Sequence, residues 1–298
     1  MSITLNVNPG VCYSWEDFCA NSPTYSVALD GYVGHGPCYN DGKVLVNFNH
    51  HEGCDRLATR STCAQVLMAI RQGMFTKFRD EFGVKANIYV NDCDEDVCTS
   101  WFLLNNHHMV VDTMNPMINR LVAMEDALDS TAGAYPFPSD LPALKELAWV
   151  FEPYRQFRML GALEKLDGLA FKSIITDVEH RILKHVTGHG KSVSVFDTRY
   201  ELIGSGNGWA MVKEIGPYAR TAMFGNGIKA YISVKERADG NFTYTLGKLS
   251  SFIPFDLLKL TIRLNQLDEV VTENNKWGGG NNIIGSPRTT GSIFSPQI

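Results

Sequence analysis

Short apolar runs alternate with segments of helical spacing over the first third of the chain. Three runs of strand length end at polar residues, and they are Tyr25–Asp30, Lys43–Phe48 and Ala86–Val90. Helical spacing covers Ala58–Gly73 and Val97–Leu104. This alternation predicts a parallel sheet with helices on both faces, and such sheets bind ligands at the carboxyl ends of their strands.

The middle of the chain is predicted to be helical, and a linker then leads to a second region. Helical spacing with few turn signals runs from Leu141 to about His185. It is interrupted at Pro153, because proline cannot donate the helical hydrogen bond. The segment Thr187–Gly190 is typical of a linker.

The last third of the chain mixes strands with helices. Its predicted elements are the strands Ser192–Asp197, Ala230–Lys235 and Phe242–Leu246 and the helices Trp209–Phe224 and Pro254–Gln266. Asp239-Gly240 is a hairpin signal between the last two strands. We therefore predict an α/β protein, with a parallel-sheet N-terminal domain and flanking helices over 1–187 and a smaller mixed α/β C-terminal domain over 192–298.

Composition and charge narrow the class of protein. The chain has 298 residues, 44% hydrophobic and 20% charged, which suits two globular domains. The net charge of −5 argues against a protein that coats DNA or RNA. Residues 1–189 carry 15 basic and 23 acidic side chains, whereas residues 190–298 carry 12 and 9. This division suits a metal-binding domain followed by a domain that holds an anion, although the halves of a protein also differ by chance.

The sequence also indicates a cellular compartment. No apolar run has the length of a membrane span, and the N-terminus lacks a basic segment followed by an apolar one. The seven cysteines are irregularly spaced, which fits reduced thiols better than a disulfide framework. We therefore expect a cytoplasmic protein with no membrane association.

Carboxylates gather after the third predicted strand. Asp92, Asp94, Glu95 and Asp96 occupy four of five consecutive positions. Neighbouring carboxylates repel one another and lose hydration on burial, and a divalent cation is the usual compensation. A solvated acidic loop is the alternative. The position between an apolar strand and an apolar helix favours metal binding, and it makes Asp92, Asp94 and Asp96 candidate ligands.

Histidines and further acids follow the other predicted strands. Asn49-His50-His51 comes after the second strand, where His50 can bind an ion while His51 faces a substrate, and a pair at the surface is the alternative. Asp30 ends the first strand. Asp126 and Asp129 share one face of their segment if it is helical, and one of the two is a further candidate ligand. The tripeptide recurs at Asn106–His108, at a predicted helix end, and ranks lower there.

A glycine-rich loop near the C-terminus is a candidate substrate-binding segment. Gly278, Gly279 and Gly280 allow the backbone to approach a ligand closely and to direct N–H groups at an anion. Asn281 follows them, and Arg288 could bind a phosphate group in a bidentate manner. The alternative is a tail without a binding role.

Together these residues resemble the motifs of the DHH phosphoesterase superfamily and its associated C-terminal domain. The family motif H-x-D-x-D-G-x-T-S is similar to the stretch from Asp92 to Ser100, which matches it at Asp94, Asp96 and Thr99-Ser100. Asn49-His50-His51 resembles the family's Asp-His-His, and Asp30 resembles its strand-end Asp. Asp126 or Asp129 resembles its last metal-binding Asp. In the C-terminal part, Gly278–Asn281 resembles the family's G-G-G-H loop, and Tyr218–Leu249 resembles its C-terminal sheet.

The chain departs from the family pattern at three positions and in the order of its motifs. Asn49 stands where the family has Asp, Asp92 where it has a histidine ligand, and Asn281 where it has a histidine that contacts substrate. The D-x-D segment also follows the His-His segment here. Because strand ends converge in space, a sheet with another strand order can still assemble the site.

The resemblance implies a metal-dependent phosphoesterase that hydrolyses a short nucleotide-type phosphodiester. Two ions would activate a bridging water, His51 would face the phosphoryl group, and the glycine loop with Arg288 would hold the far end of the substrate. Oxygen-rich ligands with imidazole suit Mn²⁺, with Mg²⁺ as the alternative. The expected partners are a small phosphoester or a short oligonucleotide, not long duplex nucleic acid, and a homodimer is left open. The rival functions are a non-catalytic nucleotide- or phosphate-binding protein and an interaction protein with a solvated acidic loop.

Overall fold

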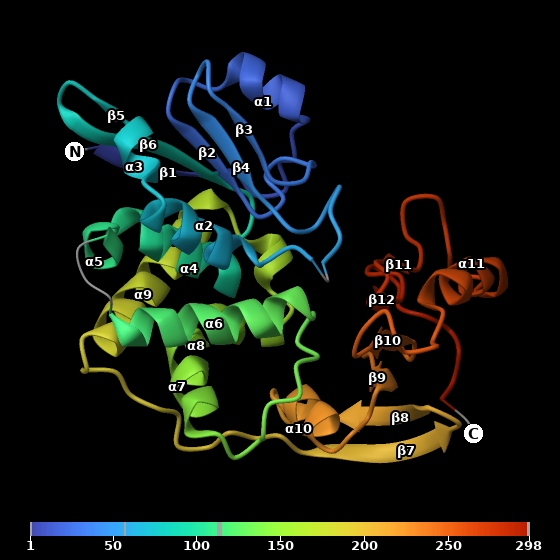
Figure 1. Ribbon diagram of the computed structural model, residues 1–298. Helices are drawn as coiled ribbons and strands as arrows, with labels where there is room; N and C mark the ends of the chain where they lie inside the picture. The colour runs from blue at the N-terminus through green and yellow to red at the C-terminus, as the bar shows by residue number, and fades with distance from the viewer. Residues whose placement is uncertain (1, 57, 112–114, 297–298) are drawn as a thin grey trace. The chain divides into compact units, whose positions relative to one another are not determined.

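A computed structural model describes residues 2–56, 58–111 and 115–296 of the chain. The chain forms two compact units (Figure 1). The first consists of Met1–Ser130 and Pro142–Ser194, and the second of Thr131–Leu141 and Val195–Ile298. Within the described ranges no helix combines the length and the apolar character needed to cross a lipid bilayer.

The first unit contains a mainly parallel sheet and most of the helices. Its strands are β1 (Ser2–Val7), β2 (Ser26–Leu29), β3 (Cys38–Asn40), β4 (Leu45–Phe48), β5 (Arg79–Asp80) and β6 (Gly83–Val90). Its helices are α1 (Trp15–Asn21), α2 (Thr62–Arg71), α3 (Met74–Lys77), α4 (Glu95–Asn105), α5 (His108–Val111), α6 (Pro116–Ser130), α7 (Pro142–Val150), α8 (Glu152–Met159) and α9 (Gly168–Val186), with a 3₁₀ turn at Leu163–Lys165. Pro153 lies in the first turn of α8, where a missing N–H costs no helical bond.

The sheet of the first unit has the strand order β1-β6-β2-β4-β3, with β5 paired to β6 beside this path. Strands β1, β6, β2 and β4 are parallel, and β3 is antiparallel to β4. Every residue of β2 and β4 is buried, as expected for central strands covered on both faces. Phe18 of α1 packs with Ala28 and Leu45 on one face, whereas α2, α4 and α9 pack on the other (Figure 1).

The second unit is a mixed sheet with one helix on each face. Its elements are β7 (Tyr200–Gly206), β8 (Trp209–Glu214), α10 (Ala219–Gly225), β9 (Ala230–Glu236), β10 (Phe242–Lys248), α11 (Leu257–Leu267), β11 (Gly278–Gly279) and β12 (Ile283–Gly285), and the sheet order is β11-β12-β10-β9-β8-β7. Only β8 and β9 pair in parallel among these, because α10 connects them. Met223 of α10 packs with Val212, and Leu257 of α11 packs with Leu246 and Trp277 in the other cluster.

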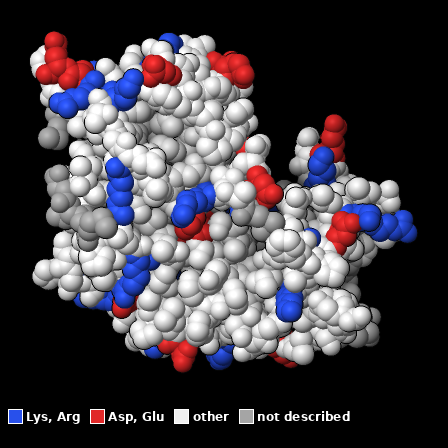
Figure 2. All heavy atoms as spheres, in the orientation of Figure 1, with Lys and Arg blue, Asp and Glu red and all other residues white. Residues whose placement is uncertain are grey.

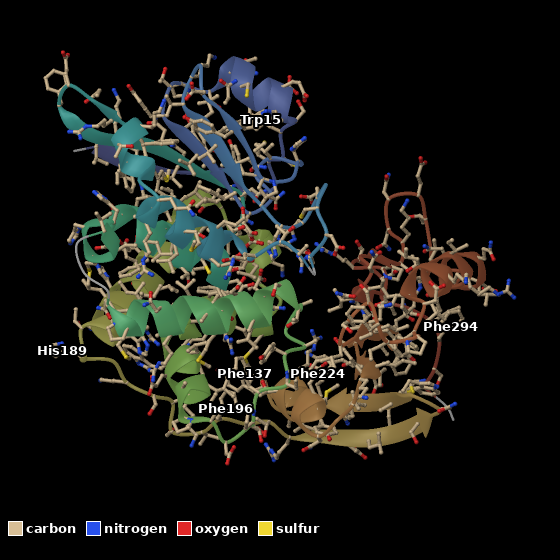
Figure 3. All side chains as sticks on the ribbon, in the orientation of Figure 1. Trp15, Phe137, His189, Phe196, Phe224 and Phe294 are labelled. Atoms are coloured by element: carbon tan, nitrogen blue, oxygen red, sulfur yellow. The ribbon has the colours of Figure 1, made fainter. Side chains whose placement is uncertain are left out.

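The predicted fold class is confirmed, but the predicted boundary differs from the observed division. The prediction placed all residues up to 187 in the first domain. The structure groups 131–141 with the second unit, because Ala134 belongs to the core around α10 and Phe137 lies beside Gly225 at the end of that helix (Figure 3). The first unit also continues to Ser194.

Two predicted elements of the second region are wrong. The segment Trp209–Phe224 was expected as one helix, but its first part is strand β8, in which Ala210 and Val212 are buried on alternate positions. Helix-forming residue types are overridden there by pairing with β7 and β9. Ser192–Asp197 was expected as a strand, yet it has no strand partner among the described residues. Phe196 instead stacks on Tyr218, with the ring centroids 4.1 Å apart.

Candidate metal centre

The carboxyl ends of three parallel strands bring the candidate ligands to one edge of the first sheet. Asp30 follows β2, His50 lies two residues after β4, and Asp96 lies in α4 beyond the end of β6. The Asp30 N–H donates to the carbonyl of Phe48 at 2.9 Å, so the β2 and β4 ends are held together. Asp30 also adopts a left-handed backbone conformation, with φ of 48°. Such conformations in non-glycine residues concentrate at functional sites.

His50 is the centre of this group. Its Nε2 atom lies 2.7 Å from Asp129 Oδ2, 3.4 Å from Asp30 Oδ1 and 3.7 Å from Asp96 Oδ2. The ring is fully buried, as are Asp30 and Asp96 within a few per cent. Neither His50 ring nitrogen has a partner with hydrogen-bond geometry among the described residues, and Asp129 Oδ2 has none either. A buried nitrogen directed at three carboxylates, without a hydrogen bond, is an arrangement that suits a cation between them.

The first turn of α2 supports the same carboxylates. The backbone N–H groups of Thr62 and Cys63 donate to the two oxygens of Asp96, each at 2.7 Å, and the Thr62 hydroxyl donates to Asp30 at 2.9 Å. Helix N-termini favour negative charge because their N–H groups are unpaired and the helix dipole is positive there. Asp96 therefore accepts from the first two N–H groups of α2, and its remaining lone pairs are still available to an ion.

Of the two acids on α6, the structure brings Asp129 to the cluster and not Asp126. Asp129 groups with His50 and Asp96, and its side chain is 24% exposed. Asp126 instead accepts a hydrogen bond of 2.7 Å from the backbone N–H of Ser61, the residue that caps α2. The choice between them could not be made from the sequence, because they lie three positions apart on one helix face.

Asp92 and Asp94 lie near the cluster but have local backbone partners. Asp94 caps α4 by accepting from the N–H of Val97 at 2.9 Å, and Asp92 accepts from the N–H of Cys93 at 2.6 Å. Neither contributes an atom to the groups of possible ligand atoms that converge on His50 among the described residues. Burial and the charge of Asp30 raise the pKa of both carboxyls, so the negative charge of the cluster acts on both.

The electrostatics show an excess of buried negative charge around one imidazole. Burial opposes protonation of His50, but Asp129 and Asp30 outweigh it and raise the His50 pKa to about 10. Burial likewise opposes ionisation of Asp30, yet the two histidines hold its pKa far below the usual range. Burial and the charges of Asp129 and Asp30 raise the pKa of Asp96 well above its usual value. One imidazolium thus compensates only part of the cluster, and a divalent cation would compensate more.

His51 differs from its neighbour in exposure and in partners. Its side chain is 34% exposed, and its Nε2 atom lies 3.0 Å from Asp30 Oδ1. The guanidinium of Arg56 donates to its other ring nitrogen, Nδ1, and to the backbone carbonyl of Asp129. Arg56 was not predicted from the sequence, since a single arginine in a polar loop carries no motif.

Asn49 has a role that aspartate cannot perform. Its buried amide group donates to the carbonyls of Val33 and His35 and to Glu52, and its Oδ1 accepts from the N–H of His51. A carboxylate at this position would face two carbonyl oxygens without a proton to share. Asparagine at this position thus fits the loop that positions His51, and Asn49 is not directed at the cluster.

The predicted glycine loop lies in the second unit and forms part of its sheet. Gly278 and Gly279 are strand β11, which pairs with β12, and Gly280 donates its N–H to Ile283. Gly279 has a φ of 142°, and a Cβ there would collide with the Ile283 carbonyl. The hairpin therefore explains Gly279 without a ligand. Arg288 lies in the same unit, where its backbone carbonyl accepts from Arg237.

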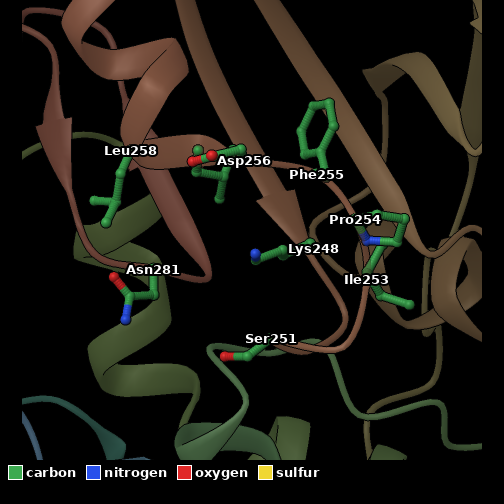
Figure 4. A pocket seen from close by; sticks show the side chains of 9 residues that line it. Lys248, Ser251, Ile253, Pro254, Phe255, Asp256, Leu258 and Asn281 are labelled. Carbon is green, nitrogen blue, oxygen red and sulfur yellow. The ribbon is translucent and has the colours of Figure 1, made fainter.

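Asn281 borders a pocket of about 330 Å³ in the second unit (Figure 4). Lys248 and Ser251 lie at its polar side, and Ile253, Phe255 and Leu258 are among its apolar residues. Asn281, predicted to bind substrate, thus lines a pocket that holds one cationic and one anionic side chain, Lys248 and Asp256.

The second Asn-His-His is not part of the cluster. The His107 ring packs on Phe75, with the centroids 4.3 Å apart, and the exposed His108 begins the short helix α5.

A further buried acid was missed by the sequence analysis. Glu125 on α6 is 3% exposed, one turn before Asp129, and its Oε2 atom has no hydrogen-bond partner among the described residues. The apolar spacing of α6 was the available signal, because Glu125 falls on its buried face.

The donor set suits a hard divalent cation. Asp30 and Asp129 offer carboxylate oxygens, Asp96 retains free lone pairs, and His50 offers one imidazole nitrogen. Oxygen donors with one or two imidazoles are typical of Mn²⁺ and Mg²⁺ sites, not of thiolate-rich zinc sites.

A comparison with protein-family models finds no match for this chain, and searches of curated proteins and of solved structures find none either.

Proposed function

We propose that the first unit is a metal-dependent phosphoesterase of the DHH type. One observation carries the proposal: His50 Nε2 lies within 2.7–3.7 Å of three carboxylates, and neither ring nitrogen has a hydrogen-bond partner among the described residues. A single imidazole at 2.7 Å from Asp129 compensates at most one of the three carboxylates, and a divalent cation would compensate the others. The solvated-loop alternative is disfavoured because Asp96 is 1% exposed.

The chain's own residues account for the holding of ions and the orientation of substrate. His50, Asp96 and Asp129 would hold Mn²⁺ or Mg²⁺, with Asp30 as a neighbouring donor. Bound ions of this kind activate a water and polarise a phosphoryl group. His51, which is partly exposed at the edge of the cluster, would donate a hydrogen bond to the phosphoryl group.

The proposed substrate is a short nucleotide-type phosphodiester. Among the residues visible in Figure 2, basic and acidic side chains alternate, and they form no continuous basic surface of the kind that long nucleic acid requires. Asn281 and Lys248 beside the pocket of the second unit supply donors for an anionic group. All seven cysteines are free thiols, which supports a reducing, cytoplasmic location.

Metal analysis combined with a hydrolysis assay tests this proposal. We expect purified protein to bind Mn²⁺ and to hydrolyse a generic phosphodiester, bis(4-nitrophenyl) phosphate, only when the ion is added. His50→Gln should lose both properties, because it removes the central nitrogen donor. The matched control is His108→Gln, which alters the other copy of Asn-His-His at an exposed position and should retain both.

A non-catalytic nucleotide- or phosphate-binding protein is the second candidate function. It is favoured by Asp92 and Asn281, which stand where the DHH family has histidines, and by the half-buried position of Asp92 beside the cluster. Tight Mn²⁺ binding with retention of an unhydrolysed nucleotide would support this function over the enzyme. Failure of wild-type protein to bind Mn²⁺ or Mg²⁺ would contradict both.

A further inference from the structure

Arg56 connects the histidine loop to the end of helix α6. It lies between β4 and α2, and its side chain is half-buried. One terminal nitrogen donates to His51 Nδ1, and the other donates to the backbone carbonyl of Asp129 at 3.3 Å. The same guanidinium therefore contacts the residue predicted to face the substrate and the residue placed beside His50.

The direction of the Arg56–His51 hydrogen bond fixes the tautomer of His51. A guanidinium only donates, so His51 Nδ1 must accept and the ring hydrogen must lie on Nε2. That Nε2–H group lies 3.0 Å from Asp30 Oδ1, which can accept it. The other ring nitrogen of a functional histidine commonly decides in this way which role the first one takes.

The two adjacent histidines are therefore prepared for different roles. His50 directs a buried nitrogen at three carboxylates and has no hydrogen-bond donor on Nδ1 among the described residues. The guanidinium of Arg56 donates to His51 Nδ1, so the Nε2–H group of His51 lies at the partly exposed edge of the cluster. A nitrogen that carries a hydrogen cannot also coordinate a metal ion, because its lone pair is used.

We propose that Arg56 is a positioning residue that holds His51 as an Nε2–H donor, to Asp30 in this structure and to a phosphoryl oxygen once Asp30 contacts a metal ion, and excludes His51 from the set of metal ligands. This inference rests on the proposed phosphoesterase function and assigns a role to a residue that no sequence motif contains. Arginine suits it better than lysine, because its planar fork reaches His51 and the Asp129 carbonyl together.

The experiment compares Arg56→Ala and Arg56→Lys with Arg60→Ala in the full chain. Arg60 is a matched control, because it lies in the same loop, its side chain is 65% exposed, and among the described residues that side chain pairs with Asp126. The tautomer of His51 is measured by ¹⁵N NMR of the imidazole in metal-free protein, with assignment by His51→Gln. Mn²⁺ affinity, kcat and KM for bis(4-nitrophenyl) phosphate are measured in parallel.

Wild-type protein and Arg60→Ala should show His51 with its hydrogen on Nε2, whereas Arg56→Ala should show a tautomer mixture. Arg56→Ala should reduce kcat by about 10–100-fold, the range typical for partners that orient such histidines. Its Mn²⁺ affinity should stay within about twofold, because Arg56 contacts Asp129 at its backbone carbonyl and not at its carboxylate. Arg56→Lys should recover part of kcat, and added guanidinium should partly rescue Arg56→Ala.

Two results would overturn the inference. A wild-type His51 with its hydrogen on Nδ1 would exclude the assigned hydrogen bond. A loss of Mn²⁺ affinity in His51→Gln as large as that in His50→Gln would make His51 a metal ligand. Failure of the proposed function is recognised separately, because wild-type protein would then bind no Mn²⁺ or hydrolyse nothing while the NMR measurement still decides the role of Arg56.

Discussion

The edge of the first sheet and the glycine hairpin of the second unit gave similar signals in the sequence, but their structures differ in kind. Both looked like ligand-binding segments. At the sheet edge, the buried His50 ring has no hydrogen-bond partner among the described residues. In the hairpin, pairing between β11 and β12 explains why Gly279 lacks a side chain.

This contrast teaches that a residue type indicates function only where the fold gives it no other reason to be there. Gly279 is required by its backbone conformation and by the nearby Ile283 carbonyl. Asp94 and Asp96 are partly explained in the same way, because they cap α4 and α2. His50 and Asp129 cap no helix and pair with each other at 2.7 Å, and they are the residues on which a ligand hypothesis should depend.

The largest effect is expected for His50→Gln in metal-free protein as a function of pH. The unfolded imidazole titrates near 6.5, and burial against Asp129 and Asp30 raises the folded pKa to about 10. The stability that His50 supplies is therefore fully present below pH 6.5 and is lost as pH rises through about 10. Removal of one partner from a buried ion pair costs about 3–5 kcal/mol.

Chemical denaturation of wild-type and His50→Gln proteins between pH 6 and pH 10, with chelator present, measures this difference. The gap in unfolding free energy should be widest at pH 6 and should narrow toward pH 10. His108→Gln serves as the control and should follow wild type throughout. A difference in unfolding free energy that does not change with pH would mean that His50 is neutral in the metal-free protein. The sheet edge would then not differ from the glycine hairpin by a buried ion pair.

Much of the first site was accessible from sequence because strand ends are marked by abrupt changes in polarity. Asp30 and His50 each follow a buried, mainly apolar run, and parallel strands bring such ends together. The roles of Asp94 and Asp96 were less accessible, because capping and metal binding favour the same residue type after a strand. Arg56 was inaccessible, since its partner, the Asp129 carbonyl, lies 73 positions away in sequence.

The second unit was harder to predict, for reasons of local chemistry. Trp209–Glu214 is rich in residues that favour helices, but the turn at Gly208 and pairing on both sides make it a strand. Ser192–Asp197 has a strand-like alternation, yet no neighbouring strand pairs with it among the described residues. Predicted strands depend on partners far away in the chain, whereas helices close their hydrogen bonds locally.

An intermediate effect is expected for Gly279→Val. The side chain would be forced into a conformation that glycine tolerates and valine does not, and it would collide with the β12 backbone. Strain and overpacking together should lower unfolding free energy by about 2–4 kcal/mol. Differential scanning calorimetry measures this loss, and the Mn²⁺ content should be unchanged.

Gly280→Ala is the matched substitution in the same loop. A Cβ at Gly280 has no atom within 4 Å, so its stability should be close to that of wild type. Its KM for a phosphodiester then tests the loop itself. An unchanged KM supports a structural role for these glycines, whereas a KM raised about tenfold in this stable variant would restore the loop as a substrate-binding segment.

The smallest effects, and the finest distinction, concern the two capping aspartates. In Asp96→Asn an amide group would replace one of two oxygens that accept from the N–H groups of Thr62 and Cys63. One N–H group would lose its acceptor in a buried site, which costs about 1–3 kcal/mol in metal-free protein.

In Asp94→Asn the remaining oxygen still accepts from Val97, because asparagine and aspartate are similarly good N-caps. Removal of its charge also relieves repulsion with Asp30 and Asp92, so metal-free stability should be preserved or slightly raised. Urea denaturation of both variants with chelator measures the difference, and Mn²⁺ titration then shows which charge the ion uses. Equal destabilisation of the two variants would show that Asp94 belongs to a structural network like that of Asp96, and it would remove Asp94 from the candidate ligands.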